Sequence, residues 1–128
     1  MKQQPRILVV EDEPAILRIT ARLLEAQGYT VLRASGSSEA MRVARDHAEK
    51  IHLLLTDVIM PGMNGRELAN TLRSLYPHLK RLFMSGYPAD VIAHRGVVDE
   101  GVYFLQKPFS SSDLSAKVRE ALDSRLPA

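Results

Sequence analysis

The sequence contains no cysteine, which excludes a disulfide framework, a thiolate metal site and a thiol nucleophile. No apolar stretch approaches the roughly 20 residues that a membrane-spanning helix needs, and residues 1–5 lack the apolar middle of a signal peptide. The net charge is only +2 and the basic residues are scattered, so we expect no direct nucleic-acid contact. These absences predict a soluble, cytoplasmic protein without membrane contact, whose chemistry uses oxygen and nitrogen groups.

Apolar runs and stretches of helical periodicity alternate along the 128 residues, of which 45% are hydrophobic. This length suits one domain over residues 1–128, with a flexible leader at 1–5 and a tail at 126–128. Strands are predicted at 7–10, 29–33, 51–56, 81–84 and 102–105, and helices around 16–24, 40–48, 68–75 and 114–122. Ser37-Ser38-Glu39 is predicted to cap the second helix. The segment around 88–98 has room for only a short helix, because Pro88 and Gly96 interrupt it.

Strands that alternate with helices predict an α/β fold with a doubly wound parallel sheet that is covered on both faces. In such a sheet, ligands bind beyond the carboxyl ends of the strands. The first, third, fourth and fifth strands end at polar residues, which are Glu11-Asp12, Asp57, Ser85 and Lys107. We therefore expect these residues to meet at one edge of the sheet.

Several carboxylates within a few ångströms would repel one another by several kcal/mol at an effective dielectric constant of about 20. A divalent cation removes this conflict, and oxygen-only ligands suit Mg²⁺ or Mn²⁺. Simpler interpretations are open for each residue alone: Asp12 as a favourable charge at a helix start, Asp57 as a cap, Lys107 as a surface lysine. Their shared position at strand ends favours a site for a cation and a phosphoryl group.

Four segments together resemble the receiver domain of two-component response regulators. The resemblance spans essentially the whole chain, in order and with the spacing of the family. It implies a flavodoxin-like (βα)5 fold with strand order 2-1-3-4-5. The segments are Ile7-Leu8-Val9-Val10-Glu11-Asp12-Glu13, Leu55-Thr56-Asp57-Val58-Ile59-Met60-Pro61-Gly62-Met63-Asn64-Gly65, Met84-Ser85-Gly86 and Gln106-Lys107-Pro108-Phe109.

The resemblance implies that Asp57 takes a phosphoryl group from a phosphohistidine and forms an acyl phosphate. It also implies that the Asp12 and Asp57 side chains and the Ile59 backbone carbonyl bind Mg²⁺, with Glu11 acting directly or through water. The implied partners are a histidine kinase or a histidine phosphotransfer domain. The domain itself would be a phosphoacceptor with self-phosphorylation activity, and the sequence leaves open whether its parent protein is an enzyme.

Further roles implied by the resemblance concern the response to phosphorylation. Ser85 would bond one phosphoryl oxygen and Lys107 another, and the Lys107-Pro108 bond is expected to be cis. Inward rotation of Phe104 would remodel the face made by the fourth helix, the fifth strand and the last helix. An ordinary core aromatic is an equal alternative for Phe104, which lacks the hydroxyl of the tyrosine that many receivers carry. Whether phosphorylation drives homodimerisation is left open.

In the family, the residues at two further positions gate the water that attacks the acyl phosphate. They are occupied here by Ile59 and Tyr87, which lie two residues after Asp57 and Ser85. An aliphatic and a bulky aromatic group do not help to position water, so we predict slow self-dephosphorylation.

Other classes of protein fit the sequence less well. An aspartyl-phosphate phosphohydrolase usually needs a second acid two residues after the nucleophile, where this chain has Ile59. A flavin or nucleotide module needs a glycine-rich or hydroxyl-rich loop that binds phosphate, and the loop after the first strand has neither composition. Among receivers, the stretches at 82–88 and 101–110 look most like the carboxyl-terminal receiver of hybrid sensor histidine kinases. A single-domain response regulator is the close alternative. The histidines lack metal-ligand spacing; they are His47, His52, His78 and His94.

Overall fold

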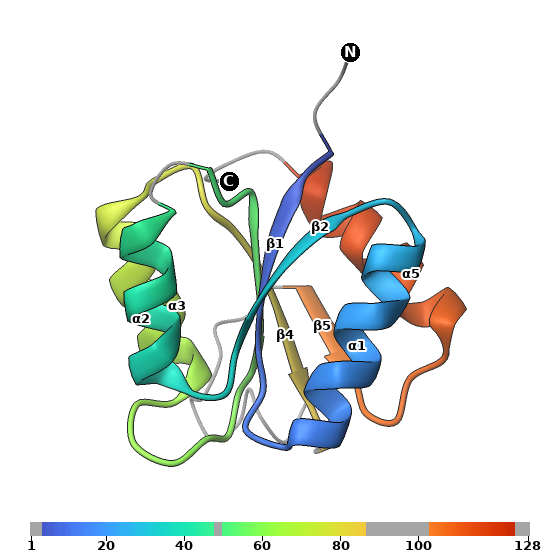
Figure 1. Cartoon of the computed structure of the whole chain (residues 1–128), viewed down its shortest axis with the longest axis horizontal. Coiled ribbons are helices and arrows are strands. Elements are labelled where there is room, and N and C mark those ends of the chain that lie inside the picture. The colour runs from blue at the N-terminus through green and yellow to red at the C-terminus, as the bar shows by residue number, and fades with distance from the viewer. Residues whose placement is uncertain (1–3, 48–49, 87–102, 125–128) are drawn as a thin grey trace.

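In the computed structural model, strands and helices alternate along the described residues, which are 4–47, 50–86 and 103–124 (Figure 1). None of the helices in these ranges is long and apolar enough to cross a membrane. The elements are β1 (Arg6–Val10), α1 (Pro14–Ala26), β2 (Thr30–Ala34), α2 (Ser37–Asp46), β3 (Leu53–Asp57), α3 (Gly65–Leu75), β4 (Lys80–Ser85), β5 (Tyr103–Gln106) and α5 (Ser111–Leu122).

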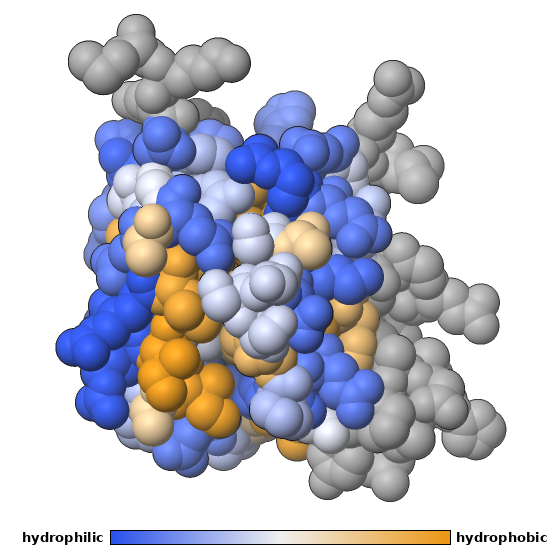
Figure 2. Space-filling model, turned by 90° about the vertical axis from the view of Figure 1, so that its right-hand side faces the viewer, coloured by the Kyte–Doolittle hydropathy of each residue, from blue (hydrophilic) through white to orange (hydrophobic). Residues whose placement is uncertain are grey.

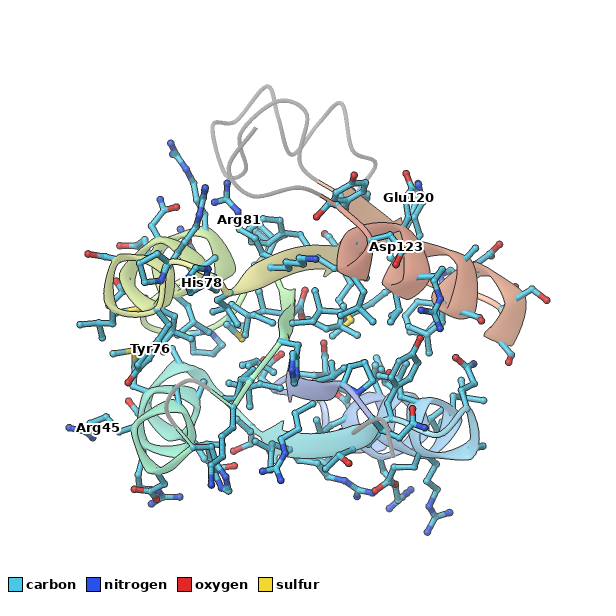
Figure 3. The ribbon with its side chains drawn as sticks, turned by 90° about the horizontal axis from the view of Figure 1, so that it is seen from above. Arg45, Tyr76, His78, Arg81, Glu120 and Asp123 are labelled. Carbon is cyan, nitrogen blue, oxygen red and sulfur yellow. The ribbon has the colours of Figure 1, made fainter. Side chains whose placement is uncertain are left out.

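All neighbouring strands are parallel, and their order is β2-β1-β3-β4-β5, which confirms the predicted fold. The central strand β3 is buried at all five positions, as expected for a strand that is covered on both faces. Figure 3, which views the sheet end-on, shows α2 and α3 on one face and α1 and α5 on the other. One apolar core lies on each face: Leu54 and Phe83 belong to the first, and Leu55 and Leu82 to the second.

Side chains cap two of the helices, but not the helix for which the sequence predicted a cap. Asn64 and Ser110 form capping boxes at the starts of α3 and α5. The predicted cap at Ser37-Ser38-Glu39 is wrong, because Gly36 is the N-cap residue and no side chain caps α2. Glu39 instead accepts a hydrogen bond from the backbone N–H of Ser35 at 3.1 Å. The Glu39 side chain therefore ties the loop before α2 to the first turn of the helix.

Two local expectations complete the comparison. The Lys107-Pro108 peptide bond is cis, as predicted. The short helix expected around 88–98 lies outside the described residues.

Candidate functional site

The parallel register brings three strand ends to the same edge of the sheet. Asp57 is the last residue of β3 and stands in register with Met84 of β4. Glu11 follows β1 directly, and its N–H donates to the carbonyl of Ala34 at 3.1 Å. Lys107 follows β5, and its N–H donates to the carbonyl of Ser85 at 2.8 Å. The three side chains therefore leave the same edge of the sheet, as the sequence predicted, and backbone hydrogen bonds fix the positions of Glu11 and Lys107 there.

Lys107 joins the two buried carboxylates of the site. Its Nζ lies 2.7 Å from Glu11 Oε2 and 3.2 Å from Asp57 Oδ2. The Glu11 and Asp57 side chains are only 2% and 10% exposed, so little water screens these ion pairs. One ammonium group therefore counters two carboxylates at the end of the central strands.

The buried environment shifts the pKa of both Glu11 and Lys107. Burial raises the pKa of Glu11 to about 7, although the hydrogen bond from Lys107 offsets part of this effect. Burial lowers the pKa of the Lys107 ammonium, but the hydrogen bond to Glu11 and the charge of Asp57 outweigh it, so its pKa lies above 10.5. Lys107 is therefore a permanent positive charge beside Asp57 at neutral pH.

A third carboxylate, Asp12, completes an acidic cluster. Glu11, Asp12 and Asp57 each place one carboxylate oxygen within 4.8 Å of a carboxylate oxygen of the other two residues. Asp12 is exposed, whereas Glu11 and Asp57 are buried. Three carboxylates against one ammonium leave a formal charge of about −2 when all are ionised. An oxygen-only donor set with this charge and an open side fits a hard divalent cation such as Mg²⁺.

The other residues predicted for the site are Ser85, Ile59, Phe104 and Tyr87. Ser85 is the last residue of β4 and is buried. Ile59 lies in the loop after Asp57 and is 45% exposed. Phe104 lies in β5, is partly buried and packs against the core beneath α2 and α3. Tyr87 lies outside the described residues.

Sequence reasoning missed the backbone contacts that hold Asp57. The Thr56 hydroxyl donates to the Asp57 carbonyl oxygen at 2.9 Å, and Gly65 packs directly against the same carbonyl. One signal in the sequence could have indicated this contact: Gly65 begins a helix directly after the Asn64 cap, although glycine has a low helix propensity.

Comparison with known proteins identifies the family. Residues 7–119 match the response regulator receiver domain. Sensor kinase CckA of Brucella abortus (strain 2308) is 36% identical over 119 residues, which cover 93% of this chain and 13% of that protein. The response regulator receiver protein CpdR of the same organism is 33% identical over 117 residues, covering 91% of this chain and 96% of that protein.

Solved structures agree with this assignment. The receiver domain of the hybrid histidine kinase CckA superposes with a TM-score of 0.78 at 40% identity, and the match covers 92% of this chain and 99% of that chain. A response regulator receiver domain protein from Clostridium thermocellum gives a TM-score of 0.81 at 31% identity, with coverages of 93% and 94%.

The chain belongs to the response regulator receiver domain family, and its role is that of a phosphoacceptor in two-component signalling. Receivers of this family exchange phosphoryl groups with histidine kinases or phosphotransfer proteins and bind Mg²⁺ through acidic residues. The chain spans only about an eighth of the sensor kinase that it matches, but nearly all of CpdR.

Proposed function

We propose that Asp57 is the residue that takes the phosphoryl group from a phosphohistidine. The observation that carries this proposal is the ammonium of Lys107 at 3.2 Å from Asp57 Oδ2 and 2.7 Å from Glu11 Oε2. An Asp57 oxygen attacks phosphorus, the P–N bond of the donor breaks, and an acyl phosphate forms. The bonding electrons leave with the donor imidazole, whose nitrogen takes up a proton.

The charges of the site suit this transfer. A phosphoryl group that approaches Asp57 brings negative charge toward carboxylates that already repel it. Lys107 can leave one carboxylate for a phosphoryl oxygen without losing its contact with the other. Ser85 ends the neighbouring strand β4, and its hydroxyl would bond a second phosphoryl oxygen. Both groups stabilise charge that develops during the transfer.

Glu11, Asp12, Asp57 and the backbone carbonyl of Ile59 would hold Mg²⁺, or Mn²⁺, at this edge. The clustering of the three carboxylates supports this set. When bound, the cation supplies positive charge that screens the carboxylates and the phosphoryl oxygens. Asp12 is the most accessible of the carboxylates and can meet an incoming ion first.

Labelling with acetyl phosphate tests the proposal. Intact-mass measurement should find a single phosphoryl group per chain when Mg²⁺ is present and none after chelation with EDTA. Continuous release of phosphate from many small phosphoesters, without a stable adduct, would instead support the aspartyl-phosphate phosphohydrolase. A chain that takes no label with Mg²⁺ present would contradict the proposal.

An apolar groove beside the site fits the protein that delivers the phosphoryl group. The groove measures about 430 Å³ and lies between α1 and the loop after β5; Ile16, Ile19, Phe109 and Lys107 are among its lining residues. Figure 2, which views the side of α1 and α5, shows apolar side chains gathered in one band on this face. Because Lys107 contributes to both the groove and the ion pairs, a partner seated there lies next to Asp57.

Replacing Ile19 with glutamate should slow phosphotransfer from a protein donor without affecting labelling by a small phosphodonor. Ile19 is 55% exposed, so the change should not unfold the domain, but it places a charge where the donor buries apolar surface. We expect phosphotransfer from a phosphohistidine protein to slow by at least about tenfold, while labelling by acetyl phosphate is unchanged. The rates of both reactions are to be compared in one preparation.

Leu75→Glu is the matched control for this substitution. Leu75 is also 55% exposed, but it ends α3, at the opposite end of that helix from the site. Equal slowing in both variants, or slowing of acetyl phosphate labelling by Ile19→Glu, would contradict docking in the groove.

The kind of protein to which this receiver belongs is also part of the proposal. The likeness to the CckA receiver favours the receiver of a hybrid sensor histidine kinase, and the likeness to CpdR supports a stand-alone response regulator as the alternative. Residues 1–128 would form one receiver domain, in the cytoplasm, where ATP-dependent kinases charge the donor histidine. Transfer to a histidine phosphotransfer domain would support the hybrid context.

Phosphorylation is proposed to act through Ser85 and Phe104. Movement of Ser85 toward the phosphoryl group would open space for inward rotation of Phe104, which now packs partly against the core. This rotation would change the surface of β5 and α5, and of the helix expected before β5. Output would pass through protein contacts on that surface, including homodimerisation.

A long lifetime of the acyl phosphate is proposed from the residues beside it. Ile59 is 45% exposed next to Asp57 and has no group that can orient a water molecule. The double variant Ile59→Asn and Tyr87→Glu should raise the rate of hydrolysis by about tenfold, because an amide and a carboxylate can position water. Decay of the labelled protein by intact mass is the measurement, and an unchanged rate would contradict this role.

A further inference from the structure

Gly65 lies against the backbone of the proposed phosphoacceptor. A Cβ atom at this position would lie 2.2 Å from the Asp57 carbonyl oxygen and 3.0 Å from the Asp57 carbonyl carbon. The φ angle of Gly65 is not positive, unlike that of Gly28 or Gly62. The close approach of the two backbones, and not an unusual conformation, therefore requires glycine here.

The Asp57 carbonyl is also held from other directions. The Thr56 hydroxyl donates to it at 2.9 Å. The following residue is fixed as well, because Val58 N–H donates to the Met84 carbonyl at 3.0 Å and the Val58 carbonyl accepts from Gly65 N–H at 2.8 Å. A side chain at position 65 would thus push on a peptide group that has little freedom to move.

The helix that carries Gly65 is equally constrained. Asn64 accepts from the N–H of Glu67 at 2.9 Å, and the Glu67 side chain accepts from the N–H of Asn64 at 3.1 Å. Leu68 and Leu72 anchor the same helix in the core beneath it. The start of α3 cannot retreat from β3 without pulling Leu68 and Leu72 out of the core.

We propose that Gly65 and Thr56 are positioning residues for phosphoryl transfer, an inference that rests on the proposed function of Asp57. Together they clamp the Asp57 carbonyl, and this sets the direction in which its carboxylate leaves β3 toward Lys107. The hydrogen bond from Gly65 to Val58 also closes the loop that carries Ile59, so the clamp extends to the carbonyl proposed as a cation ligand.

Gly65→Ala tests the clamp. Relief of the 2.2 Å contact requires a shift of about 1 Å, and a misplacement of that size can slow a catalysed step by about a hundredfold. We expect acetyl phosphate labelling at saturating Mg²⁺ to slow by about that factor. Mg²⁺ affinity, measured by titration calorimetry without a phosphodonor, should also fall. Gly36→Ala is the control, because nothing lies within 4 Å of a Cβ there and its backbone is extended.

Thermal unfolding distinguishes positioning from packing. A Gly65→Ala variant that unfolds at lower temperature, but is labelled and binds Mg²⁺ like the wild type well below that temperature, would overturn the inference. If Gly65→Ala does not fold, Thr56→Val removes the other side of the clamp, and a wild-type labelling rate in that variant would overturn it. Absence of labelling in the wild type would contradict the proposed function itself.

Discussion

Replacement of Asp57 by asparagine is expected to abolish phosphoryl incorporation from acetyl phosphate and from phosphohistidine proteins. The amide has nearly the same shape as the carboxylate but no anionic oxygen to attack phosphorus. The fold should persist, since Lys107 keeps its 2.7 Å ion pair with Glu11 and one of the mutually repelling carboxylates is lost. Intact-mass measurement after incubation with Mg²⁺ and acetyl phosphate, together with thermal unfolding, gives both readouts.

The control for this loss is Asp46→Asn, which changes an exposed carboxylate at the end of α2. It should be labelled like the wild type. Full labelling of the Asp57→Asn variant would place the phosphoryl group on another residue and refute the assignment. Unfolding of the variant would mean that Asp57 is needed for the fold, and circular dichroism separates that outcome from loss of chemistry.

Replacement of Lys107 by methionine should change two properties in opposite directions. Phosphoryl incorporation should slow by about 10²–10³-fold, because the transfer loses a preorganised positive group beside Asp57. Mg²⁺ affinity should rise by about tenfold or more, since even two unit charges of like sign about 4 Å apart repel by about 4 kcal/mol at an effective dielectric constant near 20, before desolvation, and Mg²⁺ carries two charges. Labelling rates and titration calorimetry on the same preparation measure the two effects.

Lys117→Met is the matched control for this variant, because it removes an ammonium whose only described partner is Glu120, on the exposed side of α5. It should alter neither property. Weaker Mg²⁺ binding in the Lys107→Met variant would show that the lysine organises the carboxylates for the cation instead of competing with it. Unchanged labelling would remove Lys107 from the transfer step.

The fold was predictable because its strongest signals are local. The central strands β1 and β3 appear in the sequence as apolar runs, and β3 is buried throughout because both sheet faces are covered. The ends of helices and strands were less predictable. Ser37 was expected to cap α2 but lies inside the helix, because Gly36 is the extended residue before it. Predicted and observed ends differ by no more than two residues at each of the five described strands, as expected where pairing with a neighbour decides the boundary.

The edge at which the site lies was predictable, but its internal geometry was not. Polar residues at strand ends of a parallel sheet must share an edge, and this rule brought Glu11, Asp57 and Lys107 together. The burial of Glu11, and the sharing of Lys107 between two carboxylates, depend on side-chain packing that no spacing encodes. The contact of Gly65 with Asp57 likewise depends on how closely α3 approaches β3.

The ends of the described chain lie on the side of the sheet away from the site. Residue Arg6 opens β1, and the Lys80 ammonium at the start of β4 donates to the Leu122 carbonyl at the end of α5 (Figure 1). Any polypeptide that continues from the described ends therefore starts on the side of the sheet opposite the site. A neighbouring module could be exchanged or lengthened without covering the edge that holds Glu11, Asp57 and Lys107. This geometry suits the same domain to many different arrangements of attached modules.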